Sequence, residues 1–205
     1  KTWHLNMAAI SRENPAAAAL LELSAFLAPD ENPECILTSG AVHLGFGLGD
    51  YLRGNASYDD SDAKSCEESS LALREILALL SQYSLVQWSG EPSTYSVHRL
   101  VQAVVRDQIA TEKAAEWFIQ ATAAVADAYP GSSFEHWPMC RQLLPHWLRM
   151  VEQAQEMAYR SEALGLVCNQ AGVFLEAQGR YVEAEPLLKQ DLEIRQTELG
   201  KRHPD

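Results

Sequence analysis

The chain has 205 residues, of which 28 are acidic and 16 are basic, and its formal net charge is −12. Apolar residues make up 47% of the sequence, which supports a folded core and argues against wholesale disorder. The acidic balance argues against non-specific nucleic-acid binding, because such binding needs lysine and arginine to displace phosphate counterions.

Membrane segments and secretion signals are not evident. No uncharged stretch is longer than the 15 residues of 35–49, whereas a membrane-spanning helix needs about 20 mostly apolar residues. No charged start, apolar core and small-residue cleavage site follow one another, so no signal peptide is expected. We therefore expect a cytoplasmic protein without membrane contact. The sequence has no initiator Met and stops at Asp205, so we expect a piece of a longer protein.

The cysteines and histidines predict no metal centre. The cysteines are scattered without a Cys-x-x-Cys pair, which favours free thiols in a reducing compartment. His136 and Cys140 lie four residues apart, with His146 further along. On a helix these side chains could share a face, but Pro138 and Pro145 disturb that geometry and no fourth ligand is evident.

The first part of the chain predicts helices and one acidic loop. A helix is expected over residues 15–27, because Pro15 suits a first turn and leucines follow at helical spacing. A short second helix is expected at 35–37. Residues 54–70 are polar and acidic and predict a loop. The wide apolar stripe over residues 71–80 predicts the next helix.

The pattern then changes to that of a β-hairpin. Residues 85–88 and 95–98 are strand-like, and the turn residues of 89–94 separate them. A helix is expected directly afterwards. Its apolar face comprises Leu100, Val101, Val104, Val105 and Ile109. Several helices, one hairpin and a closing helix are the element order of a winged-helix module.

The remainder predicts helices over 112–128, 136–157, 163–178 and 182–199, with a kink near Pro145 in the second of them. Gly179 suits the end of the third helix. Gly172 and Ala184 lie 12 residues apart, and small residues at this spacing let two antiparallel helices approach closely.

This last segment resembles a tetratricopeptide repeat of the kinesin-light-chain type. The matching residues include Gly172, Ala184 and Tyr181, which is expected to pack over the turn, and the tail up to His203-Pro204-Asp205. Asp191 departs from the family, which usually has Ala at this place. An ordinary helical hairpin is the simpler interpretation, but several matches at fixed offsets favour the repeat, and further repeats are then expected after it.

The resemblance implies that the first helix of the repeat lines a groove for a protein or peptide ligand. The implied groove residues are Leu166, Asn169, Val173 and Glu176. A carboxamide can both donate to and accept from a peptide backbone, which makes Asn169 the most informative of them. The alternative for Asn169 is solvation or a bond to the neighbouring turn.

The hairpin and closing helix, together with residues 15–30, resemble the winged-helix region of NB-ARC-type signal-transducing NTPases that carry tetratricopeptide repeats. In that family a Met-His-Asp motif starts the closing helix, and its histidine contacts the β-phosphate of ADP. The matching residues here are Val97, His98 and Arg99. The resemblance implies His98 as the nucleotide contact, whereas Arg99 replaces the family's acidic residue. The alternative is a structural histidine that caps the helix or lies under the hairpin.

The segment itself is expected to be non-catalytic. It contains no Gly-x-x-x-x-Gly-Lys-Ser/Thr loop, so ADP or ATP would be bound only in the longer parent protein. The glycine-rich run 45–49 follows no predicted strand and is interpreted as a flexible turn. Residues 55–98 contain seven acidic and two basic residues, which argues against DNA recognition and leaves nucleic acid out of the expected partners.

We therefore predict a mostly α-helical protein with a winged-helix-like domain over 1–110, a helical bridge over 111–160 and a first tetratricopeptide repeat over 161–205. The first hypothesis is a regulatory segment that closes over ADP on an upstream nucleotide-binding domain and links it to protein-binding repeats. The second is a peptide-binding scaffold with no nucleotide role. A phosphate-binding loop upstream of this segment would favour the first.

Overall fold

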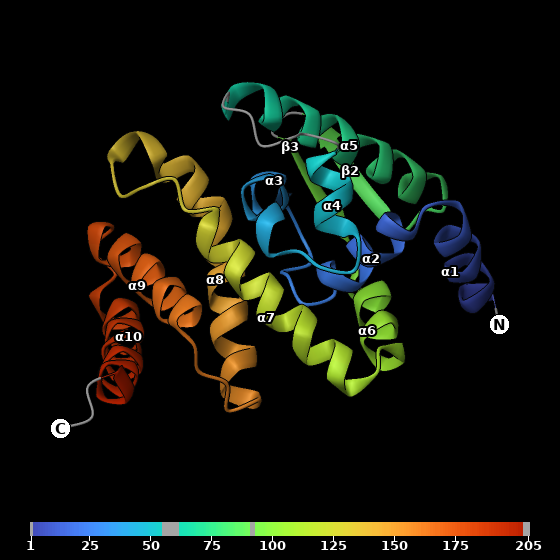
Figure 1. Ribbon diagram of the computed structural model, residues 1–205. Coiled ribbons are helices and arrows are strands. Elements are labelled where there is room, and N and C mark those ends of the chain that lie inside the picture. Colours follow the sequence, from blue (N-terminus) through green and yellow to red (C-terminus); the bar gives the residue numbers. More distant parts are fainter. Residues whose placement is uncertain (1, 55–61, 91–92, 203–205) are drawn as a thin grey trace. The chain divides into compact units, whose positions relative to one another are not determined.

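The computed structural model describes residues 2–54, 62–90 and 93–202 (Figure 1). The fold is mostly α-helical with a small three-stranded sheet, which confirms the predicted fold class. The chain divides into two compact units, residues 1–124 and 125–205. The boundaries predicted at residues 110 and 160 stay predictions.

The first unit is built mainly from helices. They are α1 (Thr2–Glu13), α2 (Pro15–Ser24), α3 (Cys35–Ser39), the 3-10 helix η1 (Gly40–His43), α4 (Leu48–Arg53), α5 (Asp62–Gln82), α6 (Arg99–Gln108) and most of α7 (Thr111–Asp127). Helix α1 was not predicted. Helix α5 begins at Asp62, so the loop predicted over 54–70 was too long.

Helix α2 begins where the sequence predicted. The Asn14 side-chain oxygen accepts hydrogen bonds from the backbone N–H groups of Ala16 (2.9 Å) and Ala17 (3.2 Å), and Pro15 occupies the first helical position. This side-chain cap satisfies N–H groups that have no partner inside the helix. The helix ends at Ser24, three residues earlier than predicted.

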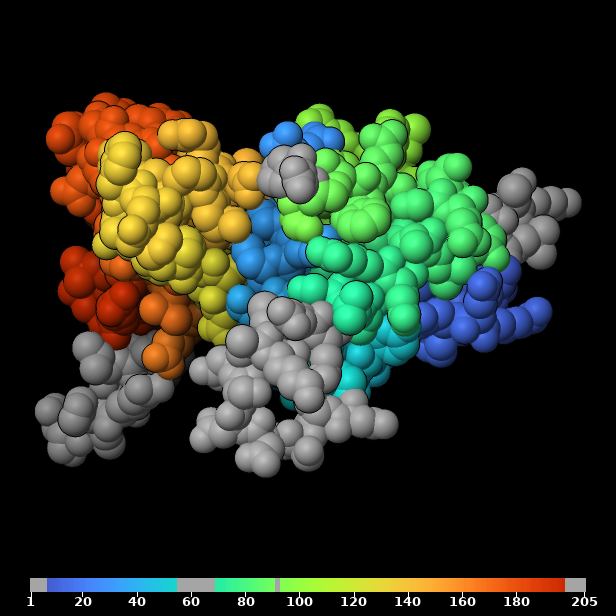
Figure 2. Space-filling model, turned by 90° about the horizontal axis from the view of Figure 1, so that it is seen from above, coloured from blue at the N-terminus to red at the C-terminus, as the bar shows by residue number. Residues whose placement is uncertain are grey.

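The sheet contains the predicted hairpin and one further strand. Strands β2 (Val86–Gly90) and β3 (Ser93–Val97) pair antiparallel, with Trp88 opposite Tyr95. The two-residue strand β1 (Asn32–Pro33) pairs with the other side of β3, so the order is β1-β3-β2. The hairpin is thus confirmed, but it belongs to a three-stranded sheet. In Figure 2 the green hairpin surface adjoins that of α5, which packs against β2.

Helix α6 is tied to the C-terminal end of α2 by two side chains. The buried Gln102 amide donates to the carbonyls of Ser24 (2.8 Å) and Leu27 (3.2 Å), and Arg106 donates to the carbonyl of Ala25. These carbonyls lie at the end of α2, where the last helical C=O groups lack intrahelical partners. Gln102 lies near the start of α6 and Arg106 in its last turn, so the contacts hold the whole helix, and with it the end of the hairpin, on the helical core.

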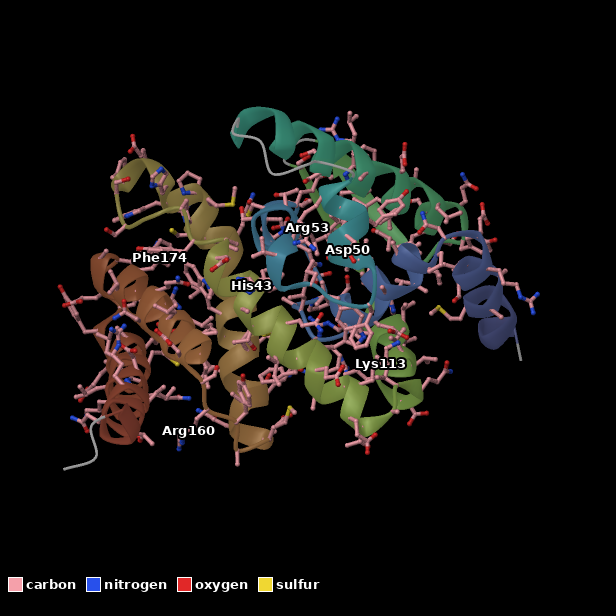
Figure 3. All side chains as sticks on the ribbon, viewed as in Figure 1. His43, Asp50, Arg53, Lys113, Arg160 and Phe174 are labelled. Carbon is pink, nitrogen blue, oxygen red and sulfur yellow. The ribbon has the colours of Figure 1, made fainter. Side chains whose placement is uncertain are left out.

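The segment between η1 and α4 lies along α7. The ring of Phe46 packs on that of Trp117, with centroids 4.7 Å apart, although Phe46 has a positive φ of 54°. Lys113, labelled in Figure 3, stands 5.1 Å from the Phe46 ring centroid and 2.5 Å from the Glu22 carboxylate. The glycine-rich run therefore forms a turn and the first residues of α4, with its aromatic residue packed against α7.

The second unit consists of the end of α7, the 3-10 helix η2 (Phe134–His136) and the helices α8 (Trp137–Glu156), α9 (Glu162–Ala177) and α10 (Tyr181–Arg202). Its core is aromatic. Phe174 of α9, labelled in Figure 3, packs edge-on against Trp137 and Trp147 of α8. Pro145 lies inside α8, and the predicted kink there stays a prediction.

Gly40 offers a test of the packing in the first unit. A Cβ atom at Gly40 would lie 2.4 Å from Cβ and 2.6 Å from Cα of Ala124, which belongs to α7. Because a backbone atom cannot move aside as a side chain can, Gly40→Ala should lower the free energy of unfolding by about 1–3 kcal/mol. Chemical denaturation measures this change. Gly90→Ala, where a Cβ would meet nothing within 4 Å, is the matched control and should be nearly neutral.

Gln102 offers a second test. Gln102→Ala removes two hydrogen bonds to buried carbonyls, so we expect a loss of about 2–3 kcal/mol in the free energy of unfolding. Gln82→Ala, at the exposed end of α5, should change it by less than about 0.5 kcal/mol. Equal unfolding midpoints for the two variants would contradict the assigned role of Gln102.

Candidate functional site

His98 lies at the junction of the hairpin and α6. It is the N-cap residue of α6, and its Nδ1 atom accepts a hydrogen bond from the backbone N–H of Leu100 (3.2 Å). A ring nitrogen that accepts cannot carry a hydrogen, so the neutral imidazole has its hydrogen on Nε2. The side chain is exposed, and Nε2 has no hydrogen-bond partner among the described residues. Of the two sequence-based alternatives, His98 caps the helix but does not lie buried under the hairpin.

The neighbours of His98 differ sharply in environment. Val97 is buried, with 1% of its surface exposed. Arg99 is 81% exposed in its side chain, and its guanidinium lies 3.9 Å from the carboxylate of Asp30. Such an exposed ion pair contributes little to stability, so Arg99 can exchange Asp30 for another anion at small cost. Leu100 is 70% exposed and places an apolar surface beside the imidazole.

Helices α9 and α10 form the helical hairpin predicted for the repeat. A Cβ at Gly172 would lie 2.6 Å from Leu188 and 3.5 Å from the carbonyl oxygen of Ala184. The absence of a side chain at Gly172 therefore allows the close approach of the two helices that the spacing predicted. Gly179, with a φ of 76°, adopts the left-handed conformation that follows the end of α9.

The four predicted groove residues lie on the accessible face of α9. Leu166 is 42% exposed, Glu176 is exposed, and Asn169 and Val173 are partly exposed. Nine other residues of α9 face the interior of the unit. The buried residues are Leu164, Gly165, Val167, Cys168, Gln170, Ala171, Gly172, Phe174 and Leu175. The structure thus brings the four predicted residues together on one side of the helix.

Asp191 organises a polar contact between α9 and α10 that sequence analysis did not predict. It is 6% exposed, and its carboxylate accepts hydrogen bonds from the Asn169 amide (3.2 Å) and from Nε of Arg195 (2.6 Å). Neither alternative considered for Asn169 included this partner. The only signal in the sequence was that Asp191 stands where the family usually has Ala.

The carboxylate also affects the buried thiol of Cys168. Burial, and to a smaller extent the negative charge of Asp191, raise the pKa of Cys168 to about 12. A charged thiolate is disfavoured at this position, so Cys168 is a packing residue rather than a nucleophile.

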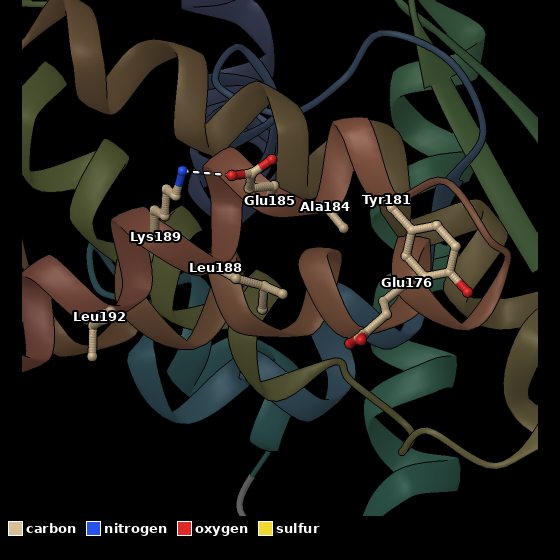
Figure 4. A pocket seen from close by; sticks show the side chains of 7 residues that line it. All are labelled: Glu176, Tyr181, Ala184, Glu185, Leu188, Lys189 and Leu192. Atoms are coloured by element: carbon tan, nitrogen blue, oxygen red, sulfur yellow. Dashed lines mark hydrogen bonds and ion pairs between the residues drawn. The ribbon is translucent and has the colours of Figure 1, made fainter.

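A groove borders the accessible face of α9 (Figure 4). It has a volume of about 400 Å³ and is lined by Glu176, Tyr181, Ala184, Glu185, Leu188, Lys189 and Leu192. Lys189 and Glu185 pair across one helical turn at 2.5 Å. Tyr181, which was expected to pack over the turn, is 65% exposed and contributes to this groove instead.

Two negative findings concern the described part of the chain. No group of three or more His, Cys, Asp or Glu side chains there is arranged to hold a metal ion. None of its helices is long and apolar enough to cross a membrane.

The geometry defines a mostly helical protein with a small sheet and a tetratricopeptide-type hairpin, and the comparisons agree. A family described as a domain of unknown function (DUF7779) matches residues 8–114, and a tetratricopeptide repeat family matches residues 166–205. Because the first match covers more than half of the sequence, the chain belongs to the DUF7779 family.

One relative aligns with the whole sequence. It is a nucleotide-binding leucine-rich repeat (NLR)-like protein of Hyaloscypha variabilis, which is 23% identical over 207 residues. The alignment covers 100% of this chain and 18% of that protein, so the chain spans about a fifth of the relative's length. No solved structure matches the chain.

Asp191→Ala tests the contact between α9 and α10. The change removes the acceptor of two hydrogen bonds, one of them from a charged donor, so we expect the free energy of unfolding to fall by about 1–3 kcal/mol. Thermal or chemical unfolding measures it, with Glu193→Ala at an exposed neighbouring position as the control. An unchanged or increased stability would show that desolvation of the Asp191 carboxylate outweighs its hydrogen bonds.

Proposed function

We propose that this chain is a regulatory segment of an NLR-type signalling protein. In this proposal His98 contacts the β-phosphate of ADP bound to a nucleotide-binding domain of the same protein, and the repeat binds a protein partner. The segment itself is non-catalytic and couples the two events. The alignment of the entire chain with an NLR-like protein is the observation that carries the proposal.

The surroundings of His98 support the nucleotide contact. An exposed imidazole with its hydrogen on Nε2 can donate to an anionic phosphate oxygen, and it does so from the N-terminus of α6, where the helix dipole favours negative charge. The nearby Arg99 guanidinium can add a second favourable charge. The exposed Leu100 and Val104 offer an apolar surface that a nucleotide-binding domain would cover.

Such a contact can act as a switch because it depends on the nucleotide state. A ligand shifts an equilibrium between two conformations only by its difference in affinity for them. A hydrogen bond to a charged group contributes about 1.5–3 kcal/mol, enough to favour the closed state about 10- to 100-fold. Loss of the His98–phosphate contact would release the segment and the repeat with it.

A protein-binding scaffold without a nucleotide role is the second candidate. The match to a tetratricopeptide repeat family and the accessible face of α9 support it independently of His98. A phosphate-binding loop in the same protein favours the switch, whereas its absence favours the scaffold.

Two substitutions at His98 separate the phosphate contact from the helix cap. His98→Ala removes both. His98→Asn keeps a good N-cap acceptor but is too short to replace the imidazole at the phosphate. In the longer protein, both variants should bind ADP about 10- to 100-fold more weakly than the wild type, as measured by titration calorimetry and by the ADP retained after purification.

The outcomes distinguish the two roles of the residue. Weak ADP binding by the alanine variant alone would assign His98 to capping. Wild-type ADP retention by both variants would exclude the proposed switch contact. His136→Ala, at a half-buried histidine of the second unit, should behave like the wild type.

A further inference from the structure

Five residues of α9 form one accessible stripe. They are Glu162, Leu166, Asn169, Val173 and Glu176, which follow each other at intervals of three or four residues and are all exposed or partly exposed. At about 1.5 Å per helical residue the two glutamates lie about 21 Å apart along the helix, which is the length of about six extended peptide residues. Two apolar side chains and one carboxamide lie between the carboxylates.

The hydrogen bond to Asp191 fixes which atom Asn169 presents to a ligand. A carboxylate only accepts hydrogen bonds, so the NH₂ group of Asn169 must face Asp191. The amide oxygen accepts no hydrogen bond from the described residues. The stripe therefore presents an acceptor at its centre, which a donor of the ligand can meet.

The charged residues around the stripe also favour a ligand that carries hydrogen-bond donors, in particular positively charged ones. Helix α9 contains Glu162 and Glu176 but no lysine or arginine. Arg195 lies next to it, bonded to Asp191 and attracted by Glu162. Lys189 and Arg160 line the two neighbouring grooves, each together with a carboxylate, Glu185 and Glu193. Five carboxylates thus stand against three basic groups, and the surface keeps an excess of negative charge.

We propose that the α9 stripe binds a peptide segment with an apolar centre flanked by lysine or arginine. Leu166 and Val173 contact the apolar side chains, Glu162 and Glu176 attract the flanking cations, and the Asn169 oxygen accepts a hydrogen bond from a peptide N–H. An acidic segment would meet like charges and a central acceptor, both of which oppose binding. This inference rests on the proposed protein-binding role of the repeat and names its ligand class.

An unbiased selection tests the ligand class. The whole chain is immobilised, and a display library of short random peptides is selected on it. We expect enriched peptides to carry lysine or arginine on both sides of apolar residues. Their affinity, measured by fluorescence anisotropy, should fall about threefold to tenfold in the double variant Glu162→Gln, Glu176→Gln, and should decrease with salt. The control Glu156→Gln, at an exposed site on α8, should bind as the wild type does.

Circular dichroism confirms that each variant keeps its helical fold before its affinity is compared. Enrichment of acidic or uncharged peptides, or an unchanged affinity in the double variant, would overturn the proposed ligand class and leave the repeat as a peptide-binding module. If no peptide is enriched over an empty surface, both the ligand class and the binding role of the repeat fail. That result would not affect the nucleotide contact, which the His98 variants test separately.

Discussion

The hydrogen bond from the Leu100 N–H to Nδ1 of His98 is the interaction on which the functional account depends. It starts α6, fixes the tautomer of the imidazole and leaves Nε2–H available outside the fold. The flanking contacts hold this arrangement in place, because Val97 is buried on one side and Gln102 ties α6 to the end of α2 on the other. A small sheet and a helix end thereby present one hydrogen-bond donor at a defined place.

The second unit applies a different constraint. Gly172 lets α9 and α10 approach closely, and this closeness brings Asn169 within reach of Asp191. The buried carboxylate then orients the amide of Asn169. The close packing of α9 and α10 therefore determines that the amide oxygen is presented on the accessible face. The same carboxylate keeps Arg195 close by and disfavours the thiolate of Cys168. Structure and recognition in this hairpin therefore depend on the same few atoms.

The sequence allowed the regular elements to be predicted, but not the contacts between distant ones. The hairpin could be predicted because strand alternation and turn residues are local signals. The start of α2 at Pro15 and the close approach of α9 and α10 at Gly172 could be predicted as well. Strand β1 could not, because Asn32 and Pro33 carry no periodic pattern and pair only through β3. The acidic residues near Asp62 concealed the start of α5. The bond between Asn169 and Asp191 joins residues 22 positions apart, so only the packed hairpin reveals it.

The tautomer of His98 in the folded chain tests the central claim most directly. A long-range ¹H–¹⁵N correlation spectrum near neutral pH distinguishes the protonated from the unprotonated ring nitrogen of each histidine. The account predicts that the neutral form of the His98 ring carries its hydrogen on Nε2, and that this pattern is lost in the His98→Asn spectrum, which assigns it. A His98 ring that carries its hydrogen on Nδ1 would contradict the cap, and with it the donor that the proposed phosphate contact requires.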